Sequence, residues 1–89
     1  MLQVRTTTRF RKDVKRVKKQ GKALQILQKV MNDIVQRISL APQYRDHVLR
    51  GNYKGRRECH LAPDWLLIYR TIAQEAIFER TGSHSELFK

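Results

Sequence analysis

The feature that most constrains the fold is a β-hairpin that we predict over residues 58–69, ECHLAPDWLLIY. Pro63 and Asp64 form its turn, because proline presets φ at the first corner and aspartate hydrogen-bonds nearby backbone. The second strand is more apolar than the first. The hairpin therefore places the imidazole of His60 just before the turn and the carboxylate of Asp64 inside it.

The residues before this hairpin indicate one strand and two helices. Residues 2–7 alternate between apolar or Thr side chains and polar ones, which suits a strand with one buried face. A helix follows the threonines at 6–8 and ends near Gly21, a residue suited to a left-handed C-cap. A longer helix over 22–40 carries a wide apolar stripe, and Pro42 stops it.

The second half of the chain indicates an antiparallel sheet. Residues 41–54 form a long connector without clear periodicity, and strands follow at 55–61, 65–72 and 75–81. Leu87 and Phe88 form a small apolar anchor near the end. The order β-α-α-β-β-β predicts a single α+β domain over 1–89. Its two N-terminal helices should pack on one face of a small, mainly antiparallel sheet.

Charge indicates the kind of partner. The chain holds 19 Lys and Arg against 8 Asp and Glu, a formal net charge of +11. Residues 1–22 alone contain nine basic residues and one acid, Asp13. Such a balance favours a polyanion, since neutralising phosphates releases counterions. We therefore expect a nucleic acid as the partner, with an anionic membrane surface as the alternative.

Other global features favour the cytoplasm. No apolar run is long enough to span a bilayer, and the N-terminus has no signal-peptide pattern. The one cysteine, Cys59, excludes an internal disulfide and fits a reducing compartment. We expect a cytoplasmic protein that does not enter the membrane.

Three histidines are the candidate reactive groups: His47, His60 and His84. With Asp64 they could supply zinc ligands, but their spacings of 13 and 24 residues match no compact zinc motif. We predict no metal and no cofactor. Imidazole can both take and give a proton near neutral pH, and cleavage of an RNA phosphodiester needs that pairing. The alternative is that all three are ordinary polar loop residues.

Arginines near the hairpin are candidates for the cation that phosphate chemistry also needs. They are Arg56, Arg57, Arg70 and Arg80. Strand alternation places Arg56, Glu58 and His60 on one face, where Glu58 either orients a neighbour or forms a surface ion pair of little energy. Trp65 and Tyr69 share a face, and each either stacks an unpaired base or packs in the core.

Three segments carry a resemblance to a known family. They are residues 44–51 (YRDHVLRG), 54–69 (KGRRECHLAPDWLLIY) and 78–88 (FERTGSHSELF). The chain resembles the YafQ-type branch of the RelE/ParE toxin superfamily, small endoribonucleases of bacterial type II toxin–antitoxin systems. The resemblance covers about half the chain. The N-terminal half matches only in its strand-helix-helix pattern.

The resemblance implies a RelE-like microbial-ribonuclease fold and a toxin that enters the ribosomal A site to cut translated mRNA. It implies a metal-free cut that leaves a 2′,3′-cyclic phosphate, and inhibition by an antitoxin protein, whose complex is a candidate for binding operator DNA. The functional positions of the family fall on six residues of this sequence: His47, His60, Asp64, Trp65, His84 and Phe88.

On this basis His84 and His60 are predicted to form the acid/base pair, with His47 as a third proton-transfer or phosphate-binding group. Asp64 is expected to orient an imidazole or read the substrate. The predicted RNA contacts are Trp65, Phe88, Arg56, Arg80, Glu58 and Lys54. Two other functions fit the charge: a non-catalytic nucleic-acid-binding protein, and a ParE-like inhibitor of gyrase, because fold alone does not determine the target.

Overall fold

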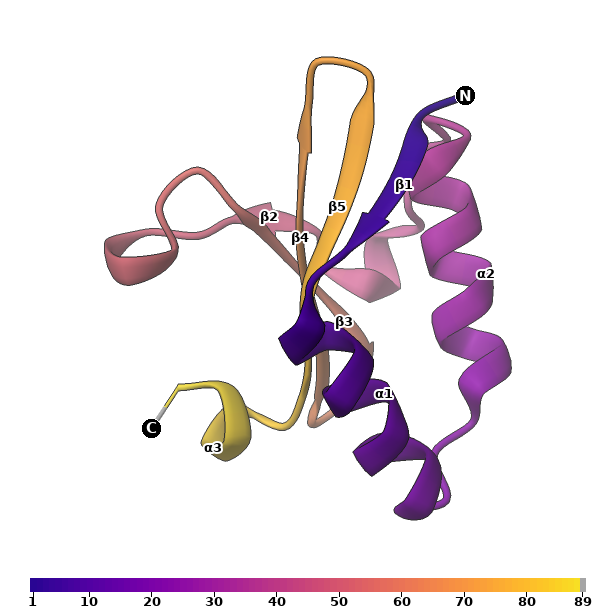
Figure 1. Cartoon of the computed structure of the whole chain (residues 1–89), viewed down its shortest axis with the longest axis vertical. Helices are drawn as coiled ribbons and strands as arrows, with labels where there is room; N and C mark the ends of the chain where they lie inside the picture. Colours follow the sequence, from indigo (N-terminus) through magenta and orange to yellow (C-terminus); the bar gives the residue numbers. More distant parts are fainter. Residues whose placement is uncertain (89) are drawn as a thin grey trace.

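The computed structural model describes residues 1–88, in which two long helices pack on one face of a five-stranded sheet and a short C-terminal helix packs against the other (Figure 1). The strands are β1 (Gln3–Thr6), β2 (His47–Val48), β3 (Arg57–Ala62), β4 (Trp65–Ile72) and β5 (Glu75–Gly82). The helices are α1 (Thr8–Lys19), α2 (Leu24–Val35) and α3 (His84–Leu87), with 3₁₀ turns η1 (Pro42–Tyr44) and η2 (Gly51–Tyr53).

The sheet has the strand order β1-β5-β4-β3-β2. Strand β1 runs parallel to β5, and every other pairing is antiparallel. The predicted α+β class, element order and mainly antiparallel sheet are confirmed. The structure adds β2 and α3, two short elements that the sequence pattern did not reveal.

The two faces of the sheet have different coverings, because side chains alternate along each strand. Trp65, Leu67 and Tyr69 of β4 point into the main core, where they meet apolar residues of α1 and α2. Leu66 and Ile68 point the other way and pack with Leu87 of α3. Leu49 and Tyr53 also pack on this second face, which we call the open face because no long helix covers it. In Figure 1 α3 and the loop after β2 lie on the side away from α2.

Helix α2 is shorter than predicted. It ends at Val35, although the apolar pattern continues to Ile38, which is 54% exposed. The end is a Schellman motif: Ile38 N donates to Asp33 O, and Arg37 N donates to Ile34 O. Arg37 takes the left-handed position, with φ 62°, that glycine usually fills. The sequence therefore showed no stop signal at this point.

The long connector is tied to the sheet. Asp46 Oδ1 accepts hydrogen bonds from the Tyr69 hydroxyl (2.7 Å) and from Arg57 Nε (3.2 Å). The next residue, His47, begins β2 and pairs with Glu58 of β3. Burial and the bond to Asp46 raise the pKa of Tyr69 far above its ordinary value, so its hydroxyl stays a donor. These contacts hold His47 against the open face.

Among residues 1–88, no helix combines the length and the hydrophobicity that crossing a bilayer requires.

Candidate active site

The open face of β3 carries the centre of the site. Cys59 and Leu61 are buried in the main core, which confirms the predicted alternation and leaves Glu58 and His60 on the opposite face. His60 lies just before the hairpin turn, and β2 brings His47 alongside through its pairing with Glu58. The sheet register therefore places two of the three imidazoles side by side.

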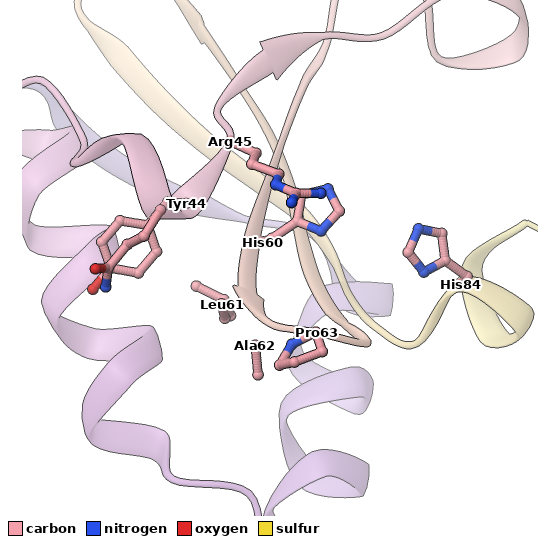
Figure 2. Close-up of a pocket in the computed structure, with 8 residues that line it drawn as sticks. Tyr44, Arg45, His60, Leu61, Ala62, Pro63 and His84 are labelled. Atoms are coloured by element: carbon pink, nitrogen blue, oxygen red, sulfur yellow. The ribbon is translucent and has the colours of Figure 1, made fainter.

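The third imidazole completes a row. The ring centroids of His47 and His60 are 6.0 Å apart, and those of His60 and His84 are 5.9 Å apart. Figure 2 shows His60, on β3, and His84, at the start of α3, facing each other across a gap. Three residues that are far apart in the sequence thus share one surface, as predicted.

Helix α3 positions His84. Ser83 caps it in a capping box: its hydroxyl accepts from Glu86 N, and the Glu86 carboxylate accepts from Ser83 N at 2.8 Å. Gly82 allows the close approach of α1, since a Cβ at Gly82 would lie 2.5 Å from Arg16 Nη2. The junction between β5 and α3 is therefore held on both sides, which defines the direction of His84.

Asp64 orients His84, one of the two roles predicted for it. Its Oδ1 accepts from His84 N at 3.0 Å and lies 2.9 Å from His84 Nδ1. The pKa of Asp64 is lowered, chiefly by the backbone hydrogen bond from His84 and then by the side-chain bond. Because a carboxylate only accepts, Nδ1 carries the proton and Nε2 of His84 is left free.

The buried carboxylate of Glu58 lies beside the other two imidazoles. It is 5% exposed, and its Oε1 lies 3.1 Å from His60 Nε2 and 3.7 Å from His47 Nε2. His60 Nε2 thus lies at ion-pair distance from a buried carboxylate. His47 Nδ1 lies 2.6 Å from the carbonyl oxygen of Arg45 and donates to it. His47 and His84 thus each have one nitrogen hydrogen-bonded to the protein, and His60 lies against the Glu58 carboxylate.

A pocket of about 580 Å³ opens beside His60 and His84, a size typical of ligand sites. Arg45 lines it, together with both histidines (Figure 2). Arg45 is exposed and forms no ion pair in the part of the chain that the structure describes. The sequence gives Arg45 no signal beyond its position two residues before His47.

The predicted cations lie elsewhere. Arg56 Nε is 2.7 Å from Glu79 Oε1, and Arg80 Nε is 2.7 Å from Asp13 Oδ2. Neither lines the pocket beside His60 and His84. Lys54 is exposed on the loop before β3. The structure thus separates these basic residues from the imidazole pair and leaves Arg45 as the arginine beside it.

The two predicted base-contacting aromatics differ in position. Trp65 is 2% exposed, and its Nε1 donates to Thr81 Oγ1 at 2.9 Å, which fits the core-packing alternative. Phe88 is 41% exposed, and its ring centroid lies 6.2 Å from that of His84. Phe88 is therefore the one that can meet a substrate directly.

One group of donor atoms could hold a metal ion. His47, Glu58 and His60 each offer one ligand atom, and the three atoms lie within 4.8 Å of one another. Two imidazoles with one carboxylate are a donor set that zinc accepts. Sequence spacing does not indicate this group, because the pairing of β2 with β3 brings the residues together.

Together, the basic chain, the α+β fold and the imidazole row define a small protein built for chemistry on a polyanion. The sequence model of a protein family, described as the bacterial toxin YafQ of type II toxin–antitoxin systems, matches residues 2–89 of this chain. The mRNA interferase toxin YafQ of Escherichia coli K12 is 40% identical over 80 residues, which cover 89% of this chain and 87% of that relative. The chain belongs to the YafQ family of type II toxin–antitoxin toxins.

Solved structures agree with this assignment. A copper-bound mutant toxin from Helicobacter pylori is 39% identical, with a TM-score of 0.95 over 99% of this chain and 100% of that one. YafQ in the Escherichia coli DinJ–YafQ complex is 36% identical, with a TM-score of 0.93 over the full length of both chains. The family likeness thus extends across both helices, although the sequence resemblance was confined to the second half.

Proposed function

We propose that this chain is a ribosome-dependent endoribonuclease that cuts translated mRNA. The observation that carries the proposal is the pair formed by His60 and His84, whose rings lie 5.9 Å apart, each with a carboxylate beside one of its nitrogens. The family assignment and the name of the Escherichia coli relative, an mRNA interferase toxin, support it.

The reaction follows from this pair. One imidazole takes the proton of a ribose 2′-hydroxyl, and the 2′-oxygen attacks the adjacent phosphorus. The bond from phosphorus to the 5′-oxygen breaks, and the second imidazole protonates that oxygen. The products are a 2′,3′-cyclic phosphate and a 5′-hydroxyl. His84 Nε2 is the free nitrogen of its ring, because Nδ1 donates to Asp64, and the Glu58 carboxylate lies beside His60 Nε2.

Charge on the phosphate needs a cation, and Arg45 is the best placed. It lines the same pocket as His60 and His84 and has no carboxylate partner among residues 1–88. A guanidinium can bind two phosphate oxygens at once and stabilises the charge that develops during attack. His47 lies at the far end of the row, where it can contribute a third proton-transfer or phosphate contact.

Its partners follow from the proposed activity. A toxin that cuts translated mRNA acts in the cytoplasm and contacts both the ribosomal A site and the mRNA. A cognate antitoxin would hold it inactive, as the DinJ–YafQ complex of the Escherichia coli relative suggests. The complex with the antitoxin is also a candidate for binding operator DNA.

The test is cleavage by the purified chain in a reconstituted translation reaction, followed by mapping of RNA ends. Wild-type protein should cut mRNA only when ribosomes translate it. His84→Ala and His60→Ala should each lose roughly 10²–10⁴-fold in rate, the usual contribution of a positioned acid or base. RNA binding without cuts would favour the non-catalytic alternative. Inhibition of gyrase without cuts would favour the ParE-like one.

Metal chemistry is the competing mechanism, because His47, Glu58 and His60 fit an ion and the Helicobacter pylori relative is copper-bound. An ion held there could activate a water molecule as a nucleophile. A chelator selective for transition metals leaves the Mg²⁺ of ribosomes in place. Cleavage that continues in this chelator would support the metal-free route, and cleavage that stops would support the metal.

A further inference from the structure

The row of flat rings does not stop at His84. Beyond it, the centroid of Phe88 lies 6.2 Å from that of His84, and Tyr53 packs edge-on against Phe88 at 5.4 Å. The Tyr53 hydroxyl donates to Leu87 O at 3.3 Å, which ties the η2 turn to α3. The imidazole row therefore continues as an aromatic surface from the catalytic pair to η2.

Two hollows lie along this extension, of about 210 and 510 Å³. Arg9, Asn52 and Tyr53 line both, so the two form one groove, which we call the arginine groove. Beside these shared residues it is lined by Arg50 and Phe88 at one end and by Arg56 and Arg80 at the other.

The charge of the groove is strongly positive. Its lining holds four arginines against one carboxylate, that of Glu79, which already pairs with Arg56. Arg80 is held by Asp13 from beneath. Arg9 and Arg50 are exposed, and neither forms an ion pair within the described residues. Two guanidinium groups are thus available to an anion that reaches the groove.

From this arrangement we infer that the arginine groove binds the single-stranded RNA that flanks the cleaved bond, with Arg9 and Arg50 on its phosphates and Tyr53 and Phe88 against a base. The inference rests on the proposed function, because it extends the substrate path of the same site. Paired positive charge and exposed rings are what unpaired nucleic acid uses, since the backbone needs cations and each base has a face to stack. An acidic protein segment would need the arginines but not the ring row.

The test measures binding rather than cleavage. A fluorescein-labelled RNA 12-mer without base pairing is titrated with each variant over a range of salt concentrations. Arg9→Ala and Arg50→Ala should each weaken binding and reduce the slope of log affinity against log salt by about 0.7, the value for one lost phosphate contact on a single strand. Tyr53→Leu should weaken binding roughly 5- to 150-fold with little change in slope, and Tyr53→Phe should retain it.

Arg37→Ala is the matched control, because Arg37 is an exposed arginine beyond the end of α2 with no ion pair among residues 1–88. It should leave both affinity and slope unchanged. Equal losses in Arg37→Ala and Arg9→Ala would reduce the effect to net charge and overturn the inference. The inference would also be overturned if the wild-type protein did not bind the RNA. It would equally be overturned if the groove variants bound the RNA normally but failed to bind an acidic partner protein.

The outcomes separate this inference from the proposed function. RNA binding that depends on Arg9 and Arg50, in a protein that never cuts mRNA, would keep the groove and reject the nuclease. If the wild-type protein cuts mRNA, while Arg9→Ala and Arg50→Ala cut at the wild-type rate and bind RNA with the wild-type salt slope, the proposed nuclease activity would stand and the RNA-binding groove would be rejected.

Discussion

Arg45→Ala is expected to impair cleavage without destabilising the protein. Arg45 is exposed, has no carboxylate partner among residues 1–88, and adopts φ 47°, a conformation equally costly for alanine. Its carbonyl, which accepts from His47 Nδ1, is unaffected by the change. The free energy of unfolding should therefore remain within about 0.5 kcal/mol of wild type.

The loss of activity follows from the contact that Arg45 would make with the phosphate. A hydrogen bond to a charged group contributes about 1.5–3 kcal/mol, which corresponds to a decrease of roughly 10- to 150-fold in rate. The cleavage rate of Arg45→Lys should fall between those of wild type and Arg45→Ala, since lysine keeps the positive charge but not the paired donors of the guanidinium group. The assay is cleavage of a translated mRNA under single-turnover conditions, with thermal unfolding measured on the same preparations.

Arg37→Ala is again the matched control, because Arg37 is also an exposed arginine in the left-handed region, with φ 62°. It should cut at the wild-type rate. If Arg45→Ala matched Arg37→Ala in activity, the pocket beside His60 and His84 would not be where the phosphate binds. A large loss of stability in Arg45→Ala would equally refute the reasoning.

Three further predictions concern the buried carboxylate of Asp13, the contact between Asp64 and His84, and the binding of metal ions. Asp13 is 3% exposed and accepts hydrogen bonds from Arg16, Arg80 and Thr81 N. Asp13→Asn should therefore lower the free energy of unfolding by about 2–4 kcal/mol and the melting temperature by more than about 10 °C. The control Asp33→Asn, which removes the exposed pair with Lys29, should change the free energy of unfolding by less than about 0.5 kcal/mol. In His84→Ala, NMR titration should show the pKa of Asp64 rising toward its ordinary value without reaching it, because the backbone hydrogen bond from residue 84 persists. Since the pKa of Asp64 is lowered in the folded protein, its carboxylate adds stability at pH values above its pKa in the unfolded chain. That stability is lost as the pH falls through its pKa in the folded protein. Micromolar Zn²⁺ or Cu²⁺ should inhibit cleavage by taking nitrogens of His47 and His60, and a selective chelator should restore it; activation by either ion would support the metal mechanism instead.

The sequence was informative where structure depends on local pattern. The alternation of β3 and β4 and the apolar stripe of α2 follow from periods of 2 and 3.6 residues, and the Pro63–Asp64 turn follows from the chemistry of those two residues. The end of α2 was wrong by five residues, because Arg37 fills a left-handed position that no residue type announced. Strand β2 has only two residues, too few for any period to be visible.

The candidate site was predicted in part, for a related reason. The three imidazoles and Asp64 could be named from residue chemistry and family resemblance, and the structure brings them together. The contacts of the surrounding charged residues depend on the packing of distant segments. Glu58 reaches His47 only through the pairing of β2 with β3, and Asp13 of α1 reaches Arg80 of β5 only when the helix packs on the sheet. No local pattern carries such information.

The central claim is that the facing imidazoles of His60 and His84 transfer the protons of an RNA cleavage. The most direct measurement is the chemistry of the new RNA end in a translating reaction that contains a transition-metal chelator. We predict a 2′,3′-cyclic phosphate with wild-type protein, and cleavage slower by roughly 10²–10⁴-fold with His60→Ala and His84→Ala proteins that melt as wild type does. Near-normal cleavage by either folded variant would contradict the claim.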